Sequence, residues 1–158
     1  MSLRYFVRWR RDHRLAEHAL DPEEARRRFG IGEPFCLVFH EGERPHAFLE
    51  VARGELSVGR LDGEGFCRLE WGFERSGQRL FLHRASLHDF DEEGEPIAQL
   101  AFFFEEEGQV TLQRSAAPFE VVETETHTFA AGEHWCPEPP FEELPVLLHR
   151  EPDLPADL

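Results

Sequence analysis

The sequence predicts a mostly-β α+β protein, in which an antiparallel meander of about nine strands forms a barrel or a sandwich. Short apolar runs rich in aromatic and β-branched residues recur between residues 34 and 129, and glycine-containing turns separate them. The chain has 158 residues, of which 41% are hydrophobic and 15 are Phe, which is enough for one domain with a sizeable core. We expect a single mostly-β domain over 1–135 and a proline-rich tail over 136–158.

The N-terminal region predicts one strand followed by one helix. Residues 3–10 alternate between two sets of side chains, with a period of two that is typical of a strand. Asp21 can cap a helix that has Pro22 in its first turn, and the basic run 26–28 followed by Gly30 suits the end of that helix. The pattern therefore predicts a helical segment at about 13–29.

The apolar runs between residues 34 and 129 predict eight further strands. Their expected ranges are Phe35–His40, His46–Ala52, Glu55–Leu61, Phe66–Phe73, Arg79–Arg84, Ile97–Glu105, Gln109–Arg114 and Phe119–Thr128. Ile97–Glu105 is nearly apolar on both faces, so we expect it to be central and buried on both sides. Phe119–Thr128 alternates Val and Thr with Glu, which is typical of an edge strand.

The tail contains six prolines after residue 136, and proline is excluded from helix interiors and central strands. It nevertheless includes the apolar stretch 144–148. We expect an extended segment that packs on the domain or on a second subunit, so both a monomer and a homodimer stay open.

The formal net charge of −15 is the strongest compositional signal for partners. It disfavours nucleic acid and anionic membranes, and it permits a basic protein partner. Acidic residues gather at two turns and form the predicted partner-binding surface: Asp89, Asp91, Glu92, Glu93 and Glu95 at one turn, and Glu105, Glu106 and Glu107 at the next. These turns should lie at opposite ends of one strand.

No catalytic motif stands out, so the sequence leaves enzymatic activity open but leans against it, and it indicates no cofactor. The absence of a signal peptide and three widely spaced cysteines favour the cytoplasm. The leading hypothesis is an acidic protein-binding module, such as a bacterial immunity-type protein that neutralises a basic toxin or enzyme. One alternative is a β-barrel that binds a small apolar ligand, suggested by the Phe-rich strands. Another is a metal-dependent enzyme that uses His127, His134 and Cys136, if these residues converge.

Overall fold

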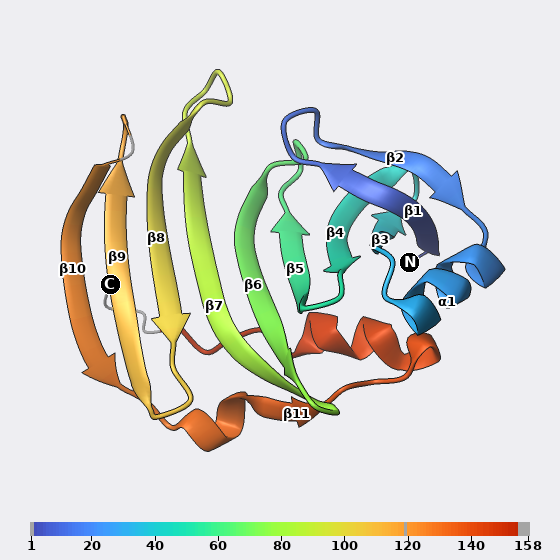
Figure 1. Cartoon of the computed structure of the whole chain (residues 1–158). Coiled ribbons are helices and arrows are strands. Elements are labelled where there is room, and N and C mark those ends of the chain that lie inside the picture. Colours follow the sequence, from blue (N-terminus) through green and yellow to red (C-terminus); the bar gives the residue numbers. More distant parts are fainter. Residues whose placement is uncertain (1, 119, 155–158) are drawn as a thin grey trace.

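The computed structural model describes residues 2–118 and 120–154, and it consists mainly of one antiparallel sheet (Figure 1). The strands are β1 (Ser2–Arg10), β2 (Leu15–Leu20), β3 (Phe35–Glu41), β4 (Arg44–Val51), β5 (Glu55–Leu61), β6 (Cys67–Ser76), β7 (Arg79–Phe90), β8 (Pro96–Phe104), β9 (Gln109–Ala116), β10 (Glu120–Thr128) and β11 (Trp135–Pro137). The helices are α1 (Pro22–Ile31) and the 3₁₀ helices η1 (Ala131–His134) and η2 (Phe141–His149).

The strand order is β10-β9-β8-β7-β6-β5-β4-β3-β1-β2, and β11 pairs with β7. The predicted meander is therefore confirmed from β3 to β10, where each strand pairs with the next. β10 lies at one end of this order, as expected for an edge strand. Within the described residues β10 and β2 do not pair with each other, so the sheet stays open and neither a barrel nor a sandwich is confirmed.

The predicted helix over 13–29 is wrong in its first half. Leu15–Leu20 forms β2, which pairs with β1 through the register Tyr5↔Leu20 to Arg10↔Leu15. The pairing of two adjacent strands outweighs the local helical signal there. The second half is confirmed: Asp21 Oδ1 accepts a hydrogen bond of 2.8 Å from the Glu24 amide, and α1 follows.

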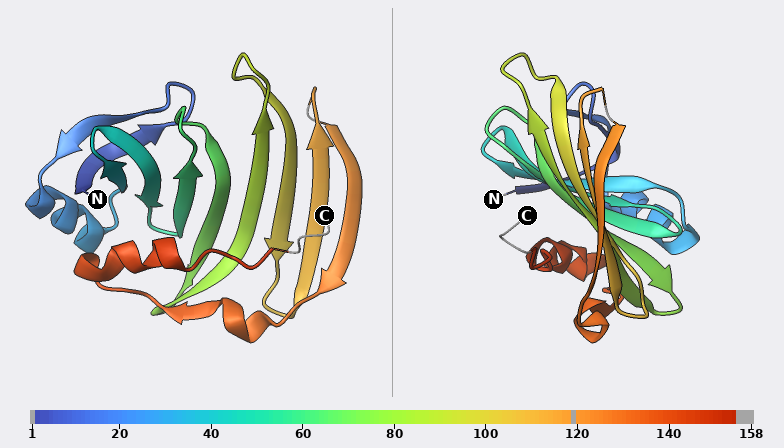
Figure 2. Two further views of the ribbon diagram at one scale, coloured as in Figure 1. Left: turned by 180° about the vertical axis from the view of Figure 1, so that it is seen from behind. Right: turned by 90° about the vertical axis from the view of Figure 1, so that its left-hand side faces the viewer.

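One face of the sheet holds the main core, and η2 covers it (Figure 2). Phe141, Leu144, Leu147 and Leu148 are buried against strand residues on this face. The expectation of an extended tail is wrong for Phe141–His149, which form η2. η2 contains Pro145, which has no backbone N–H to donate.

The opposite face is covered only in part, by the β1–β2 hairpin (Figure 1). β1 pairs with β3 over Ser2–Phe6 and then passes over this face, where Trp9 stacks on Phe48 with ring centroids 5.5 Å apart. β8 lies beyond the reach of the hairpin. Its predicted two-sided burial is therefore wrong, and Ile97 and Phe103 are each 42% exposed.

The helices of the described ranges are all too short or too polar to cross a membrane.

Candidate functional site

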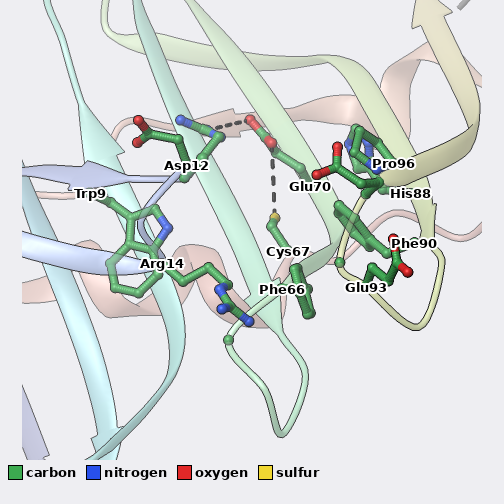
Figure 3. A pocket seen from close by; sticks show the side chains of 14 residues that line it. Trp9, Asp12, Arg14, Phe66, Cys67, Glu70, His88, Phe90, Glu93 and Pro96 are labelled. Carbon is green, nitrogen blue, oxygen red and sulfur yellow. Dashed lines mark hydrogen bonds and ion pairs between the residues drawn. The ribbon is translucent and has the colours of Figure 1, made fainter. Parts of the chain in front are cut away.

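The turns of three hairpins meet at one end of the sheet and enclose a cleft of about 550 Å³ (Figure 3). They are the β1–β2 turn, the β5–β6 turn and the β7–β8 turn, and Figure 1 shows all three at the same end. The cleft is lined by Trp9, Arg11, Asp12, Arg14, Gly65, Phe66, Cys67, Glu70, His88, Phe90, Glu93, Gly94, Glu95 and Pro96. Aromatic rings and charged groups thus share one depression.

Two of these turns are built in the same way around an aspartate. Asp62 Oδ1 accepts hydrogen bonds from the amides of Glu64 (2.9 Å) and Phe66 (3.0 Å). Asp91 Oδ1 likewise accepts from the amides of Glu93 and Glu95, both at 2.9 Å. Each aspartate is followed three residues later by a glycine with positive φ, as this turn geometry requires. The two aspartates therefore fix the turns rather than face a ligand.

A pair of stacked rings joins the second and third turns. Phe66 and Phe90 lie with centroids 4.8 Å apart. A Cβ atom on Gly94 would lie 2.7 Å from the Phe66 ring, so only glycine allows the β7–β8 turn to approach this closely. The guanidinium carbons of Arg14 and Arg68 lie 4.3 Å from the Phe66 centroid and 5.1 Å from the Phe90 centroid, respectively.

A charged cluster forms the deep side of the cleft. Arg11 Nη2 contacts Glu50 Oε1 at 2.7 Å and Glu70 Oε1 at 2.8 Å, which ties the β1–β2 turn to β4 and β6. Glu70 is only 8% exposed, and a carboxylate buried to this degree costs free energy unless a cation such as Arg11 lies beside it. Burial raises the pKa of Glu50, and the nearby Arg11 opposes that shift.

The cluster continues along β5 and β7. Arg84 binds Glu55 through both Nε (2.8 Å) and Nη2, and its Nη1 lies 3.5 Å from Glu70. A Cβ atom on Gly72 would lie 2.9 Å from both Arg84 Nε and Glu55 Oε1, so glycine provides the space for this ion pair.

Burial disfavours the charged forms of both the thiol and the imidazole of the cleft. Burial raises the pKa of the Cys67 thiol to about 12, and Cys67 Sγ lies 4.0 Å from Glu70 Oε2. Burial also lowers the pKa of His88. A protonated thiol is a poor nucleophile, so this arrangement suits binding better than covalent chemistry.

The structure separates the two halves of the predicted acidic surface. Glu93 and Glu95 line the cleft, Asp91 holds the turn, and Asp89 and Glu92 lie outside the lining. Glu105, Glu106 and Glu107 follow β8 at its other end, as the sequence predicted (Figure 1). Within the described ranges, neither Glu93 nor Glu95 forms an ion pair through its carboxylate.

The structure does not assemble His127, His134 and Cys136 into a metal site. His127 Nε2 lies 3.1 Å from Glu125 on the exposed strand β10, whereas His134 Nδ1 donates to the Leu82 carbonyl at 2.9 Å. Cys136 is buried on β11 opposite Leu80. In the described part of the chain, no three His, Cys, Asp or Glu side chains are arranged to hold a metal ion.

Several cleft residues escaped the sequence analysis, among them Arg11, Arg14, Phe66 and Glu70. The one usable signal was the shared turn pattern, an aspartate three residues before a glycine, at 62–65 and 91–94. No protein-family model and no curated protein matches this chain.

Proposed function

We propose that this protein is a binding module that docks a basic protein, and that the cleft between the three hairpin turns receives a cationic side chain of that partner. A toxin or enzyme neutralised by an immunity-type protein is a partner of this kind. The observation that carries the proposal is the pair of unpaired carboxylates, Glu93 and Glu95, beside an aromatic wall in the same cleft.

The charges of the lining support a cation as the ligand. Four carboxylates line the cleft, at Asp12, Glu70, Glu93 and Glu95, against the two arginines Arg11 and Arg14. Arg11 pairs with Glu50 and Glu70, and Asp12 pairs with Arg10 at 2.9 Å. Among the described residues, the lining charges without an ion pair are Glu93 and Glu95 against Arg14. The lining therefore keeps an excess of negative charge at its rim, where a cation can reach it.

The aromatic rings and the net charge of the molecule favour the same kind of ligand. The faces of aromatic rings attract cations by about 0.5–2 kcal/mol, and more strongly as water is excluded. The net charge of −15 attracts a basic protein over distances of about 10 Å at ordinary ionic strength. Long-range attraction and local recognition would thus act together.

The test compares two double variants with equal loss of charge. Glu93→Gln/Glu95→Gln removes the rim carboxylates, and Glu105→Gln/Glu106→Gln removes two carboxylates at the far end of β8. Fluorescence anisotropy with labelled hexalysine, at low salt, measures the affinity for cationic side chains. We expect the rim variant to bind about three- to tenfold more weakly than the wild type, and the far-end variant to stay within about twofold.

Equal weakening by the two double variants would contradict the proposal, because hexalysine would then sense only the total charge. An affinity for hexalysine that is unchanged in both double variants would contradict the proposal as well.

A further inference from the structure

The aromatic wall of the cleft already carries guanidinium groups of this chain. Arg14 lies over Phe66 at 4.3 Å, and Arg68 lies over Phe90 at 5.1 Å, while the two rings stack on each other at 4.8 Å. Figure 3 shows Arg14 directed from the β1–β2 turn toward Phe66. The rings of the cleft thus already contact guanidinium groups from the same chain.

The two arginines are held with different strength. Arg68 Nε also donates to Asp62 Oδ2 at 2.8 Å, which is a charge-assisted hydrogen bond. Arg14 Nη1 donates only to the carbonyl oxygen of Glu64, at 3.1 Å, and no carboxylate pairs with it in the described residues. Arg14 is also exposed and has a φ of 52°, in the left-handed region that non-glycine residues seldom adopt. Arg14 is therefore the easier of the two to displace.

We propose that the cleft is selective for guanidinium groups, so that it binds an arginine-bearing segment of the partner, and that Arg14 is a built-in competitor for the Phe66 ring. This inference rests on the proposed function, because it names the chemistry of the group that the cleft receives.

Guanidinium fits this site better than ammonium for two reasons. Its plane stacks on an aromatic face, and its fork of N–H donors can bind a carboxylate through two parallel hydrogen bonds. Phe66 provides the ring, and Glu93 and Glu95 provide carboxylates in the same cleft. A lysine ammonium is compact and strongly hydrated, so it can neither stack a plane on the ring nor bind a carboxylate through two parallel hydrogen bonds.

The test uses Arg14→Lys, which keeps the net charge but replaces the planar group on Phe66. Labelled hexa-arginine and hexalysine are titrated into the wild type and the variant under the same conditions. We expect the wild type to prefer hexa-arginine by about threefold or more, and Arg14→Lys to raise the affinity for hexa-arginine about three- to fivefold. The affinity for hexalysine should stay unchanged.

Two further variants complete the experiment. Arg79 lies over the Trp135 ring at 4.4 Å, outside the cleft lining, so Arg79→Lys makes the same exchange elsewhere and should change neither affinity. Phe66→Leu keeps an apolar side chain but removes the ring, and it should abolish the preference for hexa-arginine.

The outcomes separate the inference from the proposed function. Equal affinities for the two peptides, both weakened by Glu93→Gln/Glu95→Gln, would overturn the guanidinium selectivity and leave the binding of cations in place. No change in hexa-arginine affinity in Arg14→Lys would overturn the role of Arg14 as a competitor. Affinities that do not depend on Glu93 and Glu95 would overturn the proposed function itself.

Discussion

Glu55 shows how single residues set the charge of the cluster beside the cleft. Its contact with His83, at 3.3 Å, and its hydrogen bonds from Arg84 and Ser57 all favour the carboxylate. They lower the pKa of Glu55 to about 2, with the His83 contact as the largest cause. The folded protein therefore binds the proton of this carboxyl group less readily than the unfolded chain does.

That difference makes stability depend on pH in a defined direction. Because the folded-state pKa is depressed, the stabilising contribution of Glu55 is present above its ordinary pKa of 4.5 and is lost as the pH falls toward 2. We expect Glu55→Gln to be less stable than the wild type at pH 7, and the difference to shrink below pH 4.5. Denaturant unfolding followed across this range measures it.

Glu92→Gln is the matched control for that experiment, because Glu92 lies exposed on the β7–β8 turn. It should leave the acid dependence of stability unchanged. A difference between Glu55→Gln and the wild type that stays constant from pH 7 to pH 2 would contradict the role assigned to Glu55.

At the scale of elements, the approach of the β1–β2 hairpin depends on how closely β4 and β5 are packed. A Cβ atom on Gly59 of β5 would lie 2.3 Å from the ring of Phe48 on β4. Phe48 in turn supports Trp9 and lies 5.1 Å from the Arg11 guanidinium. Gly59 therefore leaves room for the Phe48 ring, and the β1–β2 hairpin contacts this ring through Trp9 and Arg11.

We expect Gly59→Ala to destabilise the protein by about 1–3 kcal/mol, because Phe48 is fully buried and has no room to move. Gly30→Ala is the control. Gly30 lies in α1 with no atom near its Cβ position, and alanine there should stabilise the helix by about 0.5–1 kcal/mol. Chemical denaturation of both variants measures the changes, and an unaltered Gly59→Ala protein would contradict the packing described.

The elements that the sequence predicted correctly are those with local signals. Asp21 and Pro22 identify the start of α1, and the glycine turns separate the strands of the meander. The errors occur where the structure of a segment depends on contacts with other elements of the fold. Leu15–Leu20 becomes β2 because β1 lies beside it, and β8 is exposed on one face because no element of the described residues covers it there.

At the scale of the whole molecule, the cleft could not be predicted because its residues come from turns far apart in the sequence, at 11–14, 65–67 and 93–96. Only the sheet order brings these turns to one end. The acidic residues of the β7–β8 turn were predicted to form part of a binding surface, which stays a prediction, and their aromatic neighbours were not identified. The second acidic turn, at 105–107, lies at the opposite end and belongs to a different surface.

The two ends of the sheet differ in the residues that surround their acidic turns. Both ends of β8 carry acidic turns. The β7–β8 turn lines the cleft together with Phe66, Phe90 and the ion-paired Glu70, whereas the β8–β9 turn follows the Phe102–Phe104 pair and lies outside this cleft. The proposed function therefore predicts that a cationic partner binds at the cleft and not at the β8–β9 turn.

Backbone amide NMR shifts, followed during a titration with hexa-arginine, test most directly whether the cleft between the three hairpin turns binds cationic side chains. We expect the largest changes to fall together at residues 10–15, 62–67 and 90–96, which surround the cleft. Changes of equal size at residues 105–108, or spread evenly over the acidic surface, would show that the peptide senses only the net charge and would contradict the claim.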